Sequence, residues 1–419
     1  MVKDIFFIVS AIAFTCCLWG GMGCSSGTGD DSANTGRTSD TDTDTDTNTD
    51  TDTDTDTDTD TDTDTDTDTD TDTDTDTDTD TDTDTDTDTD TDTDADTDGD
   101  TDTGTETGAA GIVVDGRELF VDGVPFFIRG VCWNPVPKGQ SHPEGLDYPG
   151  MAAVDIPLMQ AAGINAVRTY EPVLDRSVLD QLYGAGIYIL NTVYPWGGAE
   201  VGTAVANVNA VKDHPANLMW VIGNEWNYNG LYVELSHEES LARINEVAQA
   251  IRAIDDAHPI ATIYGEVPSA DTVNAMPDID VWGINSYRGI SFGDLFAQWE
   301  ALAVPARPLF MAEFGADAFN ANLPGYDPDS QAEATESLLS EILENRTDAG
   351  GVLLGGTIFE WADEWWKAGN VNDHDNGGIA PGGGPYPDQT FNEEWWGIVD
   401  IERIPRPAYD ALKLIYLAN

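Results

Sequence analysis

Cysteine is scarce in this chain and almost confined to its beginning. Of the four cysteines, Cys16, Cys17 and Cys24 fall within the first 24 residues, which leaves Cys132 alone in the remainder. One thiol excludes a framework of intrachain disulfides. The folded part of the chain must therefore be held together by core packing.

Positive charge is scarce as well. The chain has 17 Lys and Arg residues against 79 Asp and Glu residues, and its formal net charge is −62. So strong an excess of negative charge argues against nucleic acid or an anionic surface as a partner.

The apolar run at 5–18 is too short for a spanning helix. It follows Lys3 and precedes the small residues 20–23, which is the layout of an export signal over 1–24. Cys24 with the two serines after it resembles the cleavage and lipidation site of bacterial lipoproteins, although Gly21 stands where Leu is usual. We expect a cell-surface, lipid-anchored protein of the bacterial outer membrane, with plain secretion as the alternative.

A Thr-Asp repeat fills most of residues 25–107. Positions 40–102 hold 31 aspartates and no Lys or Arg, which is half of the net charge of −62. A segment with nothing to bury and strong self-repulsion predicts an extended, solvated tether. Calcium binding is the alternative, but no glycine-turned ligand loop interrupts the repeat.

Metal and phosphate motifs are missing. The histidines show neither His-x-His nor His-x-x-x-His spacing, and the turn at 373–377 lacks the distal bidentate glutamate of a calcium loop. No Gly-rich phosphate turn follows a strand. The sequence therefore predicts neither a metal nor a cofactor.

Residues 108–419 predict one α/β domain, a (β/α)₈ TIM barrel. Two short β runs closed by Asp-Gly, at 112–116 and 119–123, indicate an N-terminal β-hairpin. Eight strands follow, at 125–131, 164–169, 187–193, 218–222, 260–264, 281–284, 308–314 and 351–359. Helices are expected between and after them, at 155–162, 177–185, 201–212, from 236, at 292–302, from 330 and at 408–417. This alternation favours a closed parallel barrel over a doubly wound sheet.

Chemically useful residues gather where these strands end. The expected strand tips carry Trp133, Arg168, Tyr170, Trp196, Asn224, Glu225, Trp226, Tyr287, Glu313 and Trp361. The loop after the eighth strand adds Trp365, Trp366, Trp395 and Trp396. Barrel enzymes place their catalytic groups at this end. Several tryptophans on one face suit the faces of sugar rings.

Two strand tips end in glutamates, Glu225 and Glu313. Cleavage of a glycosidic bond needs two carboxyl groups, one to protonate the leaving oxygen and one to attack the anomeric carbon. The fourth and seventh strands lie across a barrel mouth, so these side chains can face each other. Other carboxylates are expected at the rim, in ion pairs or in substrate positioning, namely Glu171, Glu266, Glu360, Asp363 and Glu364.

The chain from 111 onward also resembles known enzymes. Gly-Asn-Glu at 223–225 with Ala-Glu-Phe-Gly at 312–315 resembles the retaining clan of (β/α)₈ glycoside hydrolases. The runs VDGVPFFIRGVCW, DIPLMQAAGINAVRTY and LYGAGIYIL are similar to catalytic domains of glycoside hydrolase family 2. The second run is also similar to β-1,3-glucanosyltransferases. The β-sandwich domains that usually precede a family 2 barrel are replaced by the Thr-Asp tether.

The resemblance implies a role for each matching residue. Glu225 would be the acid/base and Glu313 the nucleophile. Asn224 would bind the sugar 2-hydroxyl, Arg168 and Tyr287 would hold Glu313, and Trp361 would form the floor of the sugar site. Trp133 and Trp196 are expected to contact substrate as well.

We therefore expect a monomeric, retaining β-glycosidase that hydrolyses a polysaccharide or oligosaccharide. A β-1,3-glucan transglycosylase and a non-catalytic glycan-binding barrel are the alternatives.

Overall fold

The barrel and its surrounding helices occupy the described part of the chain. The computed structural model describes residues 111–419 except 305–306, 324 and 377–384. The expected signal segment, Cys24 and the Thr-Asp repeat lie outside the described residues, so the expectations for them stay predictions.

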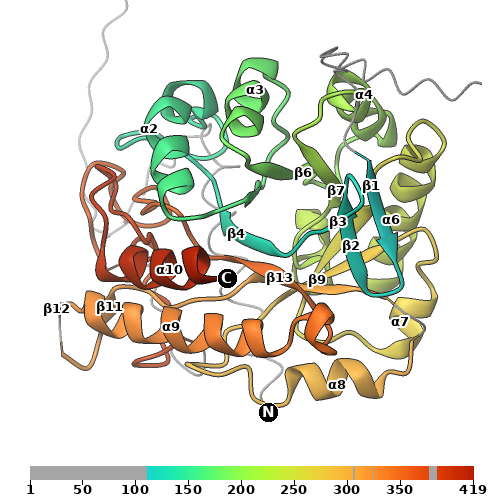
Figure 1. Ribbon diagram of the computed structural model, residues 1–419. Coiled ribbons are helices and arrows are strands. Elements are labelled where there is room, and N and C mark those ends of the chain that lie inside the picture. Colours follow the sequence, from blue (N-terminus) through green and yellow to red (C-terminus); the bar gives the residue numbers. More distant parts are fainter. Residues whose placement is uncertain (1–110, 305–306, 324, 377–384) are drawn as a thin grey trace, which may run out of the picture. The chain divides into compact units, whose positions relative to one another are not determined.

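Eight parallel strands close into a barrel (Figure 1). They are β4 (Ile128–Cys132), β5 (Ala166–Arg168), β6 (Tyr188–Tyr194), β7 (Asn217–Ile222), β8 (Ile260–Gly265), β9 (Val281–Asn285), β10 (Leu309–Glu313) and β13 (Leu353–Ile358). Sequential strands from β4 to β10 pair with one another, and β13 pairs with both β10 and β4 to complete the ring. Each strand is buried along nearly its whole length, as expected for strands that are covered on both faces. The predicted (β/α)₈ fold is confirmed.

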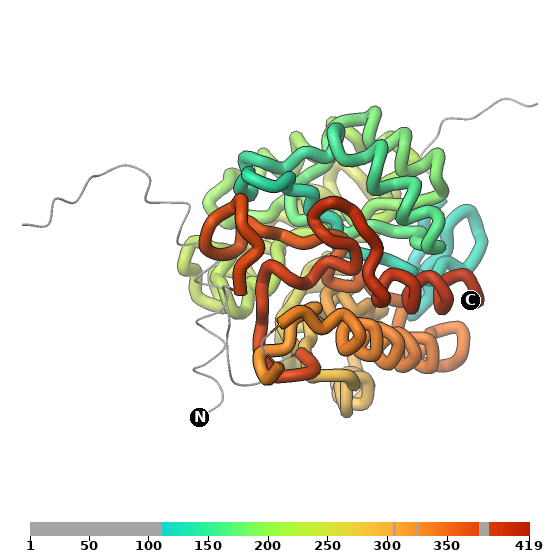
Figure 2. Tube along the Cα trace, turned by 90° about the vertical axis from the view of Figure 1, so that its left-hand side faces the viewer, coloured from blue at the N-terminus to red at the C-terminus, as the bar shows by residue number. Residues whose placement is uncertain are grey.

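Helices surround the barrel. They are α2 (Tyr148–Ala161), α3 (Arg176–Gly184), α4 (Val201–Val211), α5 (Trp226–Asn229), α6 (His237–Arg252), α7 (Ala270–Asn274), α8 (Leu295–Ala301), α9 (Pro328–Glu344) and α10 (Pro407–Ala418), with 3₁₀ turns η1 (Gly230–Tyr232) and η2 (Thr347–Ala349). The last two helices, α9 and α10, lie side by side (Figure 2). None of the described helices has the length and apolar composition that a bilayer span needs.

Short strands complete the architecture outside the barrel. An antiparallel sheet precedes it, made of β1 (Ile112–Asp115), β2 (Glu118–Val121) and β3 (Val124–Pro125), and β11 (Phe319–Asn320) pairs with β12 (Gly325–Tyr326). Leu119 and Val121 of β2 join the apolar cluster that fills the barrel, which includes Met219 and Phe310. The predicted hairpin is thus present, and its apolar face extends the barrel core.

Two helices begin earlier than the sequence predicts. Helix α2 begins at Tyr148, well before 155, because Asp147 caps it and a proline follows in the first turn. Helix α9 begins at Pro328 and not at Ser330, because the capping side chain is that of Asp327. Helix α6 begins where it was expected, because Ser236 and Glu239 form a capping box at its start.

Candidate active site

The two predicted glutamates line one cavity of about 770 Å³. Glu313 is the last residue of β10, and Glu225 follows β7 after a turn. Gly223 and Glu225 both have positive φ, at 69° and 46°, so the chain turns sharply just after the strand. Glycine suits the first of these positions because it has no Cβ to oppose that conformation. The turn directs Glu225 into the barrel mouth.

Short hydrogen bonds fix the segment that carries Glu225. The indole nitrogen of Trp226 donates to Thr262 Oγ1 at 3.0 Å, and Asn229 Nδ2 donates to the carbonyl of Asn224 at 2.7 Å. Asn227 exchanges hydrogen bonds with the backbone of Gly265. These contacts attach the loop to the neighbouring strand β8, which gives Glu225 a defined position.

Glu313 is held by three donors and is only 5 % exposed. Its Oε1 accepts from Arg168 Nη1 at 2.8 Å and from the Tyr170 hydroxyl at 2.7 Å, and its Oε2 accepts from the Tyr287 hydroxyl at 2.9 Å. Burial, with a contribution from Glu313, raises the pKa of Tyr287 well above its usual value. The phenol therefore keeps its proton and remains a donor. Three donors of this kind favour the ionised carboxylate.

Arg168 connects the nucleophile candidate to Asn224. Its Nη2 donates to Asn224 Oδ1 at 2.7 Å, and Asn285 Nδ2 donates to the same oxygen at 3.1 Å. With that oxygen accepting two hydrogen bonds, Asn224 presents its amide nitrogen as the remaining polar group. An amide nitrogen can only donate, which suits a sugar hydroxyl or the neighbouring phenol of Tyr232.

The pKa values of two phenols depend on both glutamates. Burial raises the pKa of Tyr287 and of Tyr232, and the charges of both Glu225 and Glu313 add to the increase at each phenol. A charge acts strongly only over a short distance in such a site. Glu225 and Glu313 therefore both lie near these two phenols, in the cavity that all four residues line.

Only some of the predicted aromatic contacts reach the cavity. Trp196 lines it and is 46 % exposed, so it forms part of the rim. Trp366 and Trp396 also line it, whereas Trp365 and Trp395 stack on His374. Trp226 is buried in the main core.

Neither Trp133 nor Trp361 is among the residues that line the cavity, so their roles as substrate contacts stay predictions. Trp133 turns toward the helical layer and donates its indole N–H to buried Asp155 at 2.9 Å. Trp361 follows the end of β13 and packs against Tyr409 of α10, with ring centroids 6.3 Å apart. Directly after β13, it is the ring of Phe359 that lines the cavity.

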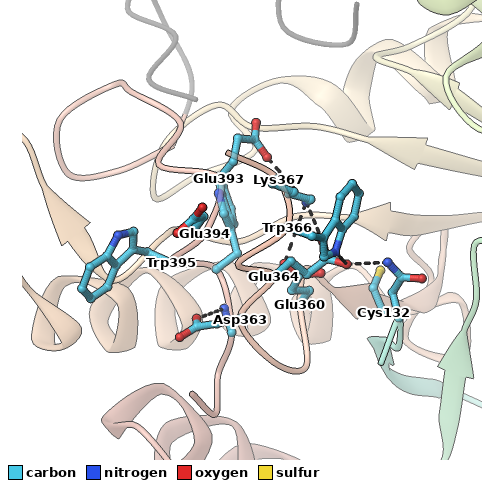
Figure 3. A network of polar contacts seen from close by, with 12 residues as sticks. Cys132, Glu360, Asp363, Glu364, Trp366, Lys367, Glu393, Glu394 and Trp395 are labelled. Carbon is cyan, nitrogen blue, oxygen red and sulfur yellow. Dashed lines mark hydrogen bonds and ion pairs between the residues drawn. The ribbon is translucent and has the colours of Figure 1, made fainter. Parts of the chain in front are cut away.

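A network around Lys367 forms one wall of the cavity (Figure 3). Its Nζ lies 2.7 Å from Glu364 Oε2, 3.5 Å from Glu393 Oε2 and 3.9 Å from Glu360 Oε1. Asn134 Nδ2 and the indole N–H of Trp366 both donate to Glu364 Oε1. We call Glu360, Glu364, Lys367 and Glu393 the lysine cluster. No sequence pattern predicts a role for Lys367 or Glu393, because both lie in the irregular segment between β13 and α10.

The remaining carboxylates fall into ion pairs or onto the cavity wall. Glu266 pairs with Arg288, and Asp363 forms a buried bidentate pair with Arg406. Glu171 lines the cavity, and burial raises its pKa to about 7. Among the residues that the structure describes, no group of three His, Cys, Asp or Glu side chains is arranged to hold a metal ion.

Comparisons with known proteins were made by family models, sequence and structure. No family model matches. The β-glucuronidase of Chlorocebus aethiops is 26 % identical over 264 residues, 57 % of this chain and 38 % of that protein. The human β-glucuronidase is 25 % identical over 264 residues, 57 % of this chain and 37 % of that protein. The 1,3-beta-glucanosyltransferase GAS4 of Saccharomyces cerevisiae is 26 % identical over 285 residues, 58 % of this chain and 57 % of that protein.

Solved structures with the same fold include the β-D-glucuronidase of Dictyoglomus thermophilum, with a TM-score of 0.55 and 18 % identity over 74 % of this chain and 54 % of that one. A GH2 β-galacturonidase from Eisenbergiella tayi bound to galacturonate has a TM-score of 0.54 and 18 % identity, with the same coverage of 74 % and 54 %. The chain thus spans less than two-fifths of the β-glucuronidases that it matches in sequence. Its closed barrel and these sequence matches make it a relative of the TIM-barrel glycoside hydrolase clan that includes the family 2 enzymes.

Proposed function

We propose that this protein is a retaining β-glycosidase that works by double displacement, with Glu313 as nucleophile and Glu225 as acid/base. One observation carries the proposal. Two glutamates from the tips of β7 and β10 line the same cavity, and three donors hold the carboxyl group of Glu313 in place. Retaining enzymes need their two carboxyl groups about 5–5.5 Å apart, on opposite sides of the scissile bond.

The first step forms a covalent glycosyl-enzyme. A Glu313 oxygen attacks the anomeric carbon while the bond to the leaving oxygen breaks, and Glu225 gives its proton to that oxygen. Oε2 is the better candidate for attack, because it accepts one hydrogen bond whereas Oε1 accepts two. Asn224 is positioned to donate to a hydroxyl of the bound sugar through its amide nitrogen.

The second step reverses the roles. Glu225, now ionised, removes a proton from an incoming water, whose oxygen attacks the anomeric carbon and releases Glu313 as a carboxylate. Two inversions return the sugar to its original configuration. A sugar hydroxyl in place of water would give transglycosylation. The match to a β-1,3-glucanosyltransferase favours this as the second candidate function.

The test is a panel of aryl β-glycosides followed by proton NMR of the first-formed sugar. We expect the β anomer first, with the α anomer appearing only by mutarotation. A 2-deoxy-2-fluoro glycoside of the accepted sugar should label Glu313, identified by peptide mapping, and should not label Glu313→Gln. First release of the α anomer, or a label on another residue, would contradict the proposal. Addition of an oligosaccharide acceptor distinguishes hydrolysis from transglycosylation. Transglycosylation gives products longer than the acceptor, and hydrolysis does not.

We further propose export with a lipid anchor at Cys24, on the strength of the signal-like segment 1–24. Cys24→Ser should move the protein from the detergent phase to the aqueous phase on Triton X-114 partition. Retention of the variant in the detergent phase would contradict anchoring at this residue.

A further inference from the structure

The charged side chains that line the cavity are almost all acidic. Among the described residues, six glutamates line it together with a single lysine, Lys367: Glu144, Glu171, Glu225, Glu313, Glu364 and Glu393. The one buried arginine nearby, Arg168, already donates to Glu313 and Asn224. The burial of His142 lowers its pKa, so this side chain adds no positive charge near neutral pH.

Lys367 is already bound by the protein's own carboxylates. Its ammonium lies within 4 Å of Glu360, Glu364 and Glu393, and it is largely shielded from solvent. Burial alone would lower its pKa, but these three carboxylates raise the pKa well above the usual value. Burial raises the pKa of Glu360 and of Glu393, whereas Lys367 and hydrogen bonds outweigh burial at Glu364 and lower its pKa. Glu364 therefore balances the ammonium, and no unbalanced positive charge is left for an anionic ligand.

The lysine cluster adjoins the candidate nucleophile. Lys367 Nζ lies 4.3 Å from the centre of the Phe359 ring. That ring packs edge-to-face against Tyr170 and Tyr287, the two phenols that donate to Glu313, with centroids 6.4 and 6.3 Å apart. A sugar whose anomeric carbon meets Glu313 would therefore lie beside this wall of the cavity.

A negatively charged sugar would meet unfavourable groups on more than one wall. Burial raises the pKa of Glu393, and burial likewise raises the pKa of Glu171 to about 7. A further anion in the cavity would oppose the ionisation of both groups, and a cation would favour it. Uncharged hydroxyls could instead donate hydrogen bonds to the same groups when these are ionised, and accept from them when these are protonated.

From this charge pattern we infer that the cavity takes glycosides without negative charge, neutral or amino sugars, and discriminates against uronides. The inference rests on the proposed glycosidase function and names its substrate class. It also separates this chain from the β-glucuronidases to which it is similar in sequence. The cavity lysine is committed to Glu364 and Glu393, so a sugar carboxylate would have to displace one of them.

Matched substrate pairs test the inference. Aryl β-glucoside and β-glucuronide differ only at C6, as do aryl β-galactoside and β-galacturonide. We expect kcat/KM for each uronide to be at least about 10-fold below that of its neutral partner, since like charges in a partly desolvated site repel strongly. An aryl 6-amino-6-deoxy-β-glucoside, which keeps the 2-hydroxyl as an acceptor for Asn224, should perform no worse than the glucoside. Equal or faster turnover of the uronides would overturn the inference.

Glu393→Gln supplies a second readout. Removal of one carboxylate from Lys367 should raise the ratio of uronide to neutral kcat/KM several-fold, while Glu364 still pairs with the lysine and supports folding. Glu336→Gln, an exposed position on α9 outside the cavity, is the matched control and should leave the ratio unchanged. A ratio that is unaltered in Glu393→Gln would overturn the assigned role of this wall.

Binding separates this inference from the proposed function. The S-linked thioglycosides of the same pairs resist cleavage, so calorimetry on the wild-type protein reports affinity alone. Tighter binding of the neutral member, with no turnover of any aryl glycoside, would refute the proposed function and support the charge inference. Turnover of aryl glycosides, together with tighter binding of the uronides, would support the proposed function and refute the charge inference. Absence of binding by every compound would overturn both.

Discussion

Arg168 joins the two halves of the candidate site, because one guanidinium nitrogen donates to Glu313 at 2.8 Å and the other to Asn224 at 2.7 Å. All three residues stand at barrel strand ends, on β5, β10 and just after β7. A planar fork with two separated N–H groups can hold both partners at once, and the point charge of a lysine ammonium cannot. The carboxyl group of Glu313 and the amide of Asn224 are thereby fixed relative to each other.

Replacement of this fork should reduce activity selectively. Arg168→Lys keeps the charge but loses one of the two contacts, and we expect kcat/KM to fall by about 10- to 100-fold, the usual cost of a hydrogen bond to a charged group. Arg403→Lys is the matched control, since Arg403 forms another buried pair with Asp155 away from the cavity. Both variants should melt at lower temperature. A similar loss of kcat/KM in both, measured where each is folded, would contradict the specific role of Arg168.

The two phenols on Glu313 should support catalysis by positioning its carboxyl group. Tyr287→Phe removes the donor to Oε2, and Tyr170→Phe removes one of the donors to Oε1. Because a hydrogen bond to a carboxylate contributes about 1.5–3 kcal/mol, kcat/KM should fall by about 10- to 100-fold in each variant. Tyr409→Phe, which loses only a hydrogen bond to the carbonyl of Leu158, is the control. An unchanged kcat/KM in both cavity variants would argue against Glu313 as the nucleophile.

Glu171 should make stability depend on pH. Burial raises its pKa from 4.5 to about 7 in the folded state, so between these values the folded protein binds more protons than the unfolded chain. The contribution of this group to the free energy of unfolding therefore falls as pH rises from about 4.5 to 7, by on the order of 1 kcal/mol for a half-buried group. Glu171→Gln should have a higher free energy of unfolding than the wild type above pH 7, and the same free energy of unfolding near pH 4. The measurement is denaturant unfolding of both proteins across this pH range. A difference in free energy of unfolding that does not change with pH would contradict the prediction.

Barrel topology explains how much of the site could be predicted from sequence. Parallel strands end at one rim, so the sequence predicts that five residues lie together there: Arg168, Asn224, Glu225, Tyr287 and Glu313. The structure brings all five to one place. Tyr170 had a readable signal too. It follows Arg168 by two residues, which places both on the same face of an extended segment.

What the strand pattern could not supply is the course of the chain beyond the strand ends. Alternation stops at the end of β13, so nothing in the sequence showed that Phe359 faces the cavity and Trp361 faces α10. Lys367 and Glu393 reach the same wall from an irregular segment, where neither the helical period of about 3.6 residues nor the strand period of about 2 applies. Their partnership depends on tertiary packing and could not be inferred from spacing.

The roles of the two glutamates can be separated by leaving group and by rescue. Glu225→Ala should lose about 10²- to 10⁴-fold on natural linkages, which need a general acid, and much less on an activated aryl glycoside. Glu313→Ala should lose the covalent intermediate whatever the leaving group. Azide should then take the place of water in Glu225→Ala and give a β-glycosyl azide, whereas in Glu313→Ala it should attack directly and give the α form. NMR of the azide products distinguishes the two. Equal losses on natural and activated substrates in Glu225→Ala, with no azide product, would mean that another carboxyl group of the cavity is the acid/base, and Glu171 would be the first to test.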